Sequence, residues 1–253
     1  MPVSTATPSH AARARLGVWP RRHDIAHLVL LDHQMVPSVD DVAGWMRDAS
    51  ATGARVIRTG ALFPGSTAAF VESGFHTVDT LALLERPVPR PSPRPESQPG
   101  ADRHRSARRL PDGARLRRLR PSMLHEAAAI DRRAFSAEWS NDVSALADIM
   151  DATPQHRSRS VHLDGHMVAF SISGRADRVG YIQRLAVDPS ARRRGLASTL
   201  LDDAERWMAR RDVARVMVNT ASNNQAALAL YESMGFELQP DPLQILQRDL
   251  PPG

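Results

Sequence analysis

Apolar residues recur at helical spacing in four stretches of the second half of the chain. Between residues 123 and 135 they stand three and four positions apart, which is the spacing of side chains on one face of a helix. The same pattern predicts further helices over 142–152, 196–208 and 227–234. Each of these helices therefore has an apolar face that must pack against another element of the fold.

The segments around these helices have the patterns of strands. Strands are predicted over 115–119, 160–163, 167–172, 181–187 and 214–219, with two short strands near 236 and over 243–246. Asp164 and Gly165 separate the second strand from the third and favour the positive φ angles of a tight hairpin turn. The order of the elements predicts an α+β (α/β-like) fold, in which a mixed central sheet carries helices on both faces.

A proline- and arginine-rich segment divides the chain. Residues 87–112 begin Pro-Val-Pro-Arg-Pro-Ser-Pro-Arg-Pro and contain few apolar side chains, so we predict an extended linker. Residues 87–121 hold ten arginines and three acidic residues, a local charge of +7, whereas the whole chain carries +5. The segment is interpreted as a solvated spacer, with a tether to RNA or another polyanion as the alternative. Nucleic acid is not expected to bind elsewhere.

The composition excludes several classes of protein and site. The 253 residues are 42% hydrophobic, which is enough for a core in one large domain or two small ones. The chain has no cysteine, so disulfide scaffolds, thiolate metal sites and cysteine nucleophiles are excluded. The histidines show no metal-ligand spacing, and no metal is expected. Because no apolar run approaches the ~18 residues of a membrane span, we expect no membrane contact and a cytoplasmic location.

Candidate chemistry lies where the strand over 181–187 meets the helix over 196–208. Three arginines at 192–194 lead through Gly195 into the helix. Glycine lets the backbone approach a ligand closely, and the first amides of a helix lack internal partners and carry the positive end of its dipole. The turn therefore suits a phosphate or pyrophosphate group, although a tight glycine turn with solvated arginines has the same pattern.

A second motif follows the strand over 214–219. It consists of Asn224, Ala227, the pair Leu230-Tyr231 and the pair Gly235-Phe236. Together with Leu185-Ala186-Val187-Asp188-Pro189 and Arg192-x-x-Gly195-x-Ala197, this motif makes residues 113–253 resemble the GNAT superfamily of N-acetyltransferases. The stretches 135–140, which contains Trp139, and 221–236 are most similar to the ribosomal-protein alanine N-acetyltransferases.

The resemblance implies a sheet that is splayed open between the strands over 181–187 and 214–219. It places acetyl-CoA in the gap as cosubstrate, with its pyrophosphate on the amides of residues 193–197. The residues that it implies for cofactor binding are Leu185, Ala186, Val187, Arg192, Arg193, Arg194, Gly195, Leu196, Ala197, Ser198 and Asn224. It makes Tyr231 the catalytic acid, whose phenol protonates the departing CoA thiolate. Two alternatives stay open: Asn224 as the N-cap of the next helix, and Tyr231 as a core aromatic.

The sequence departs from the family where a base is expected. Asn219 stands twelve residues before Tyr231, where ribosomal-protein acetyltransferases carry a glutamate, and Gln183 stands at another position where relatives often have one. An amide cannot accept a full proton, so a water chain, a residue such as Glu138 or an amine that arrives neutral must take this role. We therefore expect an α-amine acceptor, such as a protein or peptide N-terminus, rather than an ordinary lysine.

Residues 14–86 contain a faint repeat of the C-terminal pattern. The fragments Asp40-Asp41, Trp45-Met46, Ala54-Arg55-Val56 and Glu72-Ser73-Gly74-Phe75 match Asp202-Asp203, Trp207-Met208, Ala214-Arg215-Val216 and Glu232-Ser233-Met234-Gly235-Phe236. The repeat lacks the arginine and glycine turn, so we predict a smaller, degenerate αβ half-domain of the same fold without a cofactor site, with chance similarity as the alternative. The predicted parts are a disordered tail (1–13), this half-domain (14–86), the linker (87–112) and the acetyltransferase domain (113–253).

Two classes of function remain for this chain. The motifs favour an acetyl-CoA-dependent N-acetyltransferase, in which a primary amine attacks the thioester directly. The missing carboxylates favour a non-catalytic CoA-binding regulatory module instead, and a small-molecule amine is an alternative acceptor. The sequence leaves the oligomeric state open.

Overall fold

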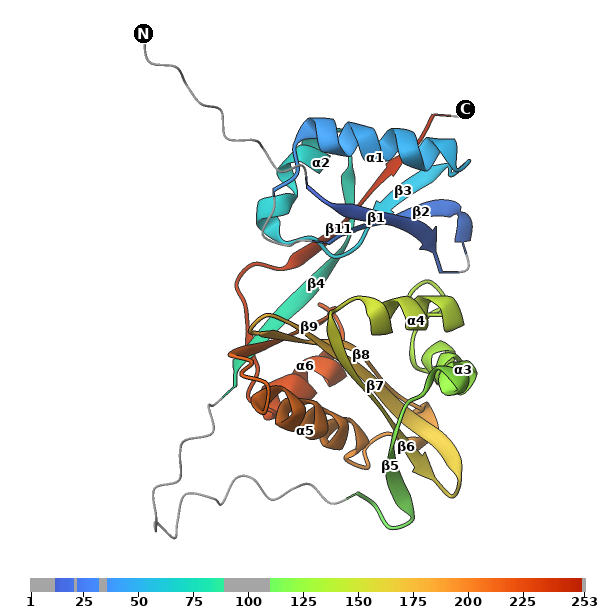
Figure 1. Ribbon diagram of the computed structural model, residues 1–253, viewed down its shortest axis with the longest axis vertical. Coiled ribbons are helices and arrows are strands. Elements are labelled where there is room, and N and C mark those ends of the chain that lie inside the picture. The colour runs from blue at the N-terminus through green and yellow to red at the C-terminus, as the bar shows by residue number, and fades with distance from the viewer. Residues whose placement is uncertain (1–11, 21, 32–35, 89–109, 252–253) are drawn as a thin grey trace. The chain divides into compact units, whose positions relative to one another are not determined.

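The chain folds as two compact units (Figure 1). Unit 1 is Met1–Ala82 with Pro240–Gly253, and unit 2 is Leu83–Gln239. The computed structural model describes residues 12–20, 22–31, 36–88 and 110–251, so the predicted tail and linker lie mostly outside the described residues. No helix in these ranges is both long enough and apolar enough to cross a membrane.

Unit 2 is built on a mixed sheet. Its strands are β5 (Ala114–Arg118), β6 (Gln155–Leu163), β7 (His166–Ala176), β8 (Val179–Val187), β9 (Arg215–Ala221), β10 (Glu237–Leu238) and the second part of β4 (His76–Pro87). Their order is β4-β9-β8-β7-β6-β5, with β10 paired to β4. Neighbours from β5 to β8 are antiparallel, whereas β8 and β9 are parallel. The predicted mixed sheet is therefore confirmed.

The hairpin of β6 and β7 turns on the dipeptide that the sequence analysis identified. Asp164 and Gly165 have φ angles of 50° and 86°, and the strands pair directly on either side of them, from Leu163 with His166. A two-residue turn with two positive φ angles matches the right-handed twist of the strands. Both strands extend further from the turn than predicted, because the polar residues there are paired across the sheet.

Helices cover both faces of the sheet of unit 2. They are α3 (Leu124–Ala134), α4 (Val143–Asp151), α5 (Leu196–Ala209) and α6 (Gln225–Ser233), with short 3-10 turns at η2 (Pro121–Met123) and η3 (Pro189–Ala191). Phe170 and Ile172 of β7 pack with α3 and α4, whereas Ala169 packs with Leu196 and Leu200 of α5. Because successive strand residues point to opposite faces, α3 and α4 lie on one face and α5 on the other. This confirms the predicted arrangement.

Unit 1 is a smaller sheet with helices α1 and α2. Its elements are β1 (Ala14–Trp19), β2 (Arg22–Leu30), α1 (Val39–Ala51), β3 (Val56–Thr59), η1 (Pro64–Ser66), α2 (Ala68–Glu72), the first part of β4, and β11 (Leu243–Asp249). The strand order is β1-β2-β3-β11-β4. The last strand of the chain thus lies inside the sheet that the first strands build.

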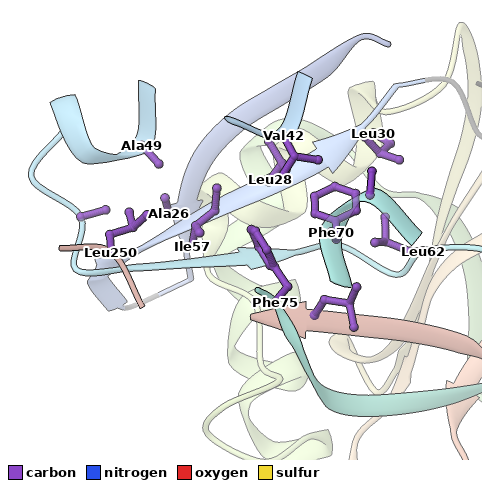
Figure 2. Packing of buried hydrophobic residues seen from close by; sticks show 13 residues of the cluster. Ala26, Leu28, Leu30, Val42, Ala49, Ile57, Leu62, Phe70, Phe75 and Leu250 are labelled. Carbon is purple, nitrogen blue, oxygen red and sulfur yellow. The ribbon is translucent and has the colours of Figure 1, made fainter. Parts of the chain in front are cut away.

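The core of unit 1 draws on both ends of the chain (Figure 2). Val42 of α1 has no exposed surface and lies against Leu28 of β2. Phe70 and Phe75 meet edge to face, with ring centroids 5.2 Å apart. Leu246, from the C-terminal strand, belongs to the same buried cluster. The core of unit 1 is therefore complete only when β11 is in place.

The two units repeat one arrangement of elements but exchange their closing strands. β2 and β3 are parallel over four residue pairs, as β8 and β9 are. β11 lies between β3 and β4 in unit 1, while the second part of β4 lies beside β9 in unit 2. This division differs from the predicted domains, which kept residues 240–253 with the acetyltransferase domain. Residues 81–86 and 243–248 have similar patterns, so the sequence does not show which sheet each strand joins.

We expect a fragment of residues 113–253 not to fold cooperatively, because it lacks the part of β4 that lies beside β9. The Val88 amide next to this strand donates to the Ala214 carbonyl at 2.8 Å, and Leu84 is fully buried. Residues 83–239, the whole of unit 2, are expected to unfold in one cooperative transition. Circular dichroism during heating distinguishes the two fragments. A cooperative transition of 113–253 at the same temperature would contradict the exchange of strands.

Candidate active site

β8 and β9 run side by side for only part of their length. Their last pair is Ile182 with Val218, and beyond it β8 continues to Val187 without β9. On its other side β8 stays paired to β7, with a register shift at Gln183. The backbone groups of residues 183–187 that face β9 therefore have no partner in that strand, which confirms the predicted opening in the sheet. A ligand that carries amide groups can pair with such an edge.

The turn between β8 and α5 leaves the first amides of the helix open. Arg193 and Gly195 have φ angles of 63° and 74°, and Gly195 is the N-cap of α5 without a side-chain hydrogen bond. Thr199 N donates to Gly195 O at 3.0 Å, which is the first hydrogen bond of the helix. The amides of residues 195–198 have no helix carbonyl to bond, and they carry the positive end of the helix dipole. The chemistry of this turn suits a phosphate or pyrophosphate group.

The corresponding helix of unit 1, α1, is closed at its N-terminus. Ser38 Oγ accepts a hydrogen bond from Asp41 N at 3.1 Å, and Asp41 Oδ2 accepts one from Ser38 N at 2.9 Å, which is a capping box. Asp40 and Asp41 also place two carboxylates in the first turn. The helix's own side chains occupy the amides and repel an anion. This supports the expectation that the N-terminal half has no cofactor site.

Arginines line the open turn before α5, and a carboxylate fixes its start. The arginines at 192–194 are exposed. Asp188 accepts hydrogen bonds from Ser190 Oγ at 2.6 Å and from Arg133 Nε at 2.7 Å. The bond from Ser190, together with the charge of Arg133, lowers the pKa of Asp188, so this carboxylate stays ionised. Arg192 Nη2 donates to the Ala134 carbonyl at 3.2 Å, and the exposed guanidinium groups of Arg193 and Arg194 add further positive charge beside the fixed amides.

Tyr231 lies on α6 with its ring packed inside unit 2. Its exposed fraction is 6%, and its ring meets Phe236 edge to face with centroids 5.7 Å apart. Burial raises the pKa of Tyr231 to about 12, against the opposing effect of the Arg184 charge. The phenol therefore keeps its proton at neutral pH and can donate it. Tyr231 is a core aromatic, as the alternative held, and it also carries a proton donor.

Asn224 is the N-cap of α6. Its Oδ1 accepts a hydrogen bond from Ala227 N at 3.2 Å, and its Nδ2 donates to Thr220 Oγ1 at 3.2 Å. The capping alternative is thus confirmed. The amide keeps one Nδ2 proton and one oxygen lone pair beyond these two bonds, so the cap does not exhaust its capacity for a ligand.

The other residues implied for cofactor binding lie on β8 and in the first turn of α5. Ala186 is buried against α3 and α4, whereas Leu185 and Val187 pack on the α5 side. Leu196 and Ser198 are buried in the first turn of α5. Ala186, Leu196 and Ser198 can face a ligand only with backbone groups, whereas the side chains of Leu185 and Val187 are half-buried.

The two positions where the resemblance places a base hold amides. Asn219 lies on β9 just beyond the last pair with β8, and it is exposed. Gln183 lies at the register shift of β8, and its Oε1 is buried without a hydrogen-bond partner among the described residues. Neither amide takes up a proton near neutral pH. Glu138, the other candidate, is exposed in the segment between α3 and α4.

The sequence analysis missed an ion pair beside this opening. Arg184 of β8 donates two hydrogen bonds of 2.6 Å to the carboxylate of Asp131 on α3, and Asp131 is fully buried. Each charge interrupts an otherwise apolar face of its element. That interruption was the available signal, because a buried charge requires a partner.

The structure contains no evident metal centre in its described part. No group of three or more His, Asp or Glu side chains there is arranged to hold a metal ion. His162, one of the histidines without metal spacing, is buried with its Nε2 3.2 Å from Ser160 Oγ. It belongs to the packing of β6.

Comparisons with known proteins decide the family. Residues 124–236 match the model of the acetyltransferase (GNAT) family. The chain is 30% identical over 118 residues to the ribosomal protein bS18-alanine N-acetyltransferase of Escherichia coli (strain K12), a match that covers 47% of this chain and 77% of that protein. The chain belongs to the GNAT family. As a GNAT protein it is an N-acetyltransferase, and its cosubstrate is acetyl-CoA.

Two further matches extend over more of the chain. The mycothiol acetyltransferase of Salinispora arenicola (strain CNS-205) is 30% identical over 186 residues, which cover 68% of this chain and 56% of that protein. The crystal structure of a tandem GNAT protein from the clavulanic acid biosynthesis pathway has a TM-score of 0.63 at 14% identity, covering 96% of this chain and 80% of that chain. This likeness shows that the GNAT fold extends over both units. The open helix terminus and the gap beside β8 fit the pyrophosphate and the amide-bearing arm of acetyl-CoA.

Proposed function

We propose that the protein transfers the acetyl group of acetyl-CoA to an α-amino group, such as the N-terminus of a peptide. The observation that carries this proposal is the pair of amides, Asn219 and Gln183, at the positions where the resemblance leads one to expect a carboxylate base. The match to the bS18-alanine N-acetyltransferase supports it, because that protein's name describes acetylation of an alanine.

The acceptor class follows from the pKa of the amine. An α-amino group has a pKa of about 7.8 and a lysine side chain about 10.4, so at pH 7 roughly 14% of the former is neutral against about 0.04% of the latter. Only the neutral amine is a nucleophile. The difference of about 2.6 pH units corresponds to roughly 3.5 kcal/mol of deprotonation. A site with Asn219 and Gln183 in place of carboxylates lacks this means of removing a proton, and it favours an amine that loses its proton readily.

The open turn before α5 would hold the cosubstrate. The amides of residues 195–198 would bind its pyrophosphate, with charge added by the arginines at 192–194. The free edge of β8 over residues 185–187 would pair with the pantetheine arm and direct an amide at the acetyl carbonyl, where negative charge develops during attack. When bound, acetyl-CoA supplies the thioester that the amine attacks.

Tyr231 would serve as the acid of the reaction. Since burial raises its pKa to about 12, its Oη carries a proton at neutral pH. Its Oη would donate this proton to the sulfur of the leaving group as the C–S bond breaks, and the proton that the amine nitrogen loses when the C–N bond forms would reprotonate the phenolate through solvent. Asn224, held two turns before Tyr231 by its capping bonds, would contact the pantetheine arm with its remaining Nδ2 proton.

A small-molecule amine is the second candidate acceptor. The match to a mycothiol acetyltransferase favours it, because that match extends over 68% of this chain rather than over unit 2 alone. Release of free thiol from acetyl-CoA tests both candidates with three probes: an alanyl peptide with acetylated lysines, spermidine and an aminoglycoside. The proposal predicts the highest kcat/KM with the peptide. Faster release with spermidine or the aminoglycoside would show that the acceptor is a small-molecule amine. Equal release with and without amine would contradict both candidate acceptors.

The rate should rise with pH and then stay level. With the alanyl peptide we expect kcat/KM to increase through the α-amine pKa of about 7.8, because the neutral fraction grows with pH. The pKa of Tyr231 is raised, so its acid form persists above neutrality and the rate should not fall again below about pH 10. Initial rates between pH 6 and about 10 measure this profile. A decline that begins near pH 8 would contradict Tyr231 as the acid.

A further inference from the structure

Arg184 joins the open strand β8 to the segment that follows α3. Its Nε and Nη2 donate to Asp131 at 2.6 Å each, and Nη2 also donates to the Trp139 carbonyl at 2.9 Å. The guanidinium carbon lies 3.6 Å from the centroid of the Phe135 ring. One side chain thus contacts both ends of the segment 135–139 and the helix before it.

Asp131 binds the backbone two residues beyond this segment, at Asn141. Its Oδ1 accepts a hydrogen bond from Asn141 N at 2.7 Å. In the amide orientation that gives both of its polar atoms partners, the Asn141 side-chain oxygen also accepts from Arg184 Nη2 at 3.2 Å. The backbone from 135 to 141, which includes no helix or strand, therefore follows a path that the ion pair determines.

The ion pair of Arg184 and Asp131 is expected to add little to the free energy of folding. The side chain of Arg184 is 16% exposed and that of Asp131 is 0% exposed. Taking two charges out of water offsets most of their attraction, and apolar residues of the same volume often stabilise a core as well or better. What the pair adds is direction, because a guanidinium with several planar donors fixes its partners in one geometry.

The pair also lies where the acceptor must approach. Arg184 lies on the part of β8 that is no longer paired to β9. Its cross-strand neighbour on β7, Ile172, packs with α3 and α4. The open terminus of α5, which suits the pyrophosphate, lies on the opposite face of the sheet. An amine that attacks a thioester on this edge therefore comes from the side of α3 and the segment 135–141. The charge of Arg184 also lowers the pKa of the Tyr231 phenol, against the larger effect of burial.

We propose that Arg184 is a positioning residue for the acceptor: with Asp131 it holds residues 135–141 as the wall against which the amine substrate binds. This inference rests on the proposed acetyl transfer. The segment offers a half-buried aromatic, Trp139, against which the first residue of the acceptor can pack. Arg184 acts through this wall and does not contact the cosubstrate.

The test compares three variants of the full chain. Arg184→Gln removes the charge and the forked donors, whereas Arg184→Lys keeps the charge and one bond to Asp131. Arg157→Gln is the matched control, because Arg157 also makes a two-bond pair with a buried carboxylate, that of Asp203, at 2.6 and 2.9 Å on the α5 side of the sheet, where Arg159 is a second partner of Asp203 at 3.3 Å. For each variant we would measure the acetyl-CoA Kd by calorimetry, the KM of the alanyl peptide, and amide hydrogen exchange over 135–141.

For Arg184→Gln we expect a KM for the peptide raised by ~10-fold and exchange over 135–141 faster by ~10-fold, with an acetyl-CoA Kd within ~2-fold of wild type. Arg184→Lys should restore part of both effects, and Arg157→Gln should leave the peptide KM and this exchange unchanged. Unchanged exchange in Arg184→Gln, or a Kd for acetyl-CoA that weakens as much as the KM, would overturn the inference. If Arg184→Gln does not fold, Arg184→Lys decides by the same two criteria. If the wild type acetylates no amine, the proposed function fails, and the exchange measurement alone decides whether Arg184 holds the segment.

Discussion

Replacing Gly195 with aspartate is expected to weaken acetyl-CoA binding by ~100-fold or more. A carboxylate at this position would stand among the amides of residues 195–198, which the pyrophosphate needs. Each charge-assisted hydrogen bond there contributes about 1.5–3 kcal/mol, so loss of two of them accounts for the expected change. Calorimetric titration of acetyl-CoA into the wild type and Gly195→Asp measures the effect.

Gly195→Asn is the matched control for charge. Asn and Asp both tolerate the left-handed conformation that the φ of 74° demands, and no described atom lies within 4 Å of the position of a new Cβ. Both variants carry the same strain of an L side chain at this φ, so their unfolding temperatures should fall slightly and by similar amounts. The affinity of Gly195→Asn should fall by ~10-fold at most, because it adds no negative charge. Wild-type affinity in Gly195→Asp would show that the pyrophosphate does not bind at this turn.

Tyr231→Phe is expected to lower kcat by ~100-fold while the acetyl-CoA Kd changes by less than ~2-fold. The substitution removes the proton donor and keeps the ring that packs against Phe236. Stopped thiol-release assays at saturating substrates give kcat, and calorimetry gives the Kd.

Phe236→Leu separates catalysis from packing. It disturbs the same ring contact without touching the phenol, so its kcat should stay within ~3-fold of wild type. Equal losses of kcat in Tyr231→Phe and Phe236→Leu would reduce the role of Tyr231 to packing in the core.

The local spacing of apolar residues predicts the helices and strands of unit 2. The helix predicted over 196–208 is α5 (Leu196–Ala209), because its apolar residues recur at i, i+3 and i+4 and its start is marked by Gly195. The strand predicted over 181–187 is β8, which begins two residues earlier at Val179. The resemblance to GNAT proteins then gave the opening between β8 and β9, a feature that no pattern of apolar residues contains.

Contacts between residues far apart in the chain could not be predicted from the sequence. β11 and the second part of β4 have similar alternation, and only the assembled sheets show that each closes the sheet of the other half of the chain. The pairing of Arg184 with Asp131 joins residues 53 positions apart, so neither residue's neighbours indicate it. Asn224 had two sequence interpretations, and its bond to Ala227 N shows the cap directly. For the strands and the ion pair, the deciding contact joins segments far apart in the sequence, whereas the cap of Asn224 is local and was among the sequence interpretations.

The central claim, that this GNAT protein acetylates an α-amine, is tested most directly by the position of the acetyl group on one peptide that offers both amines. The peptide begins with a free alanine and contains one internal lysine, and tandem mass spectrometry locates the product after limited turnover at pH 7. From the neutral fractions of the two amines we predict acetylation of the N-terminus in at least ~100-fold excess over the lysine. Predominant acetylation of the lysine would contradict the claim, because it would require a base in the site that Asn219 and Gln183 do not provide.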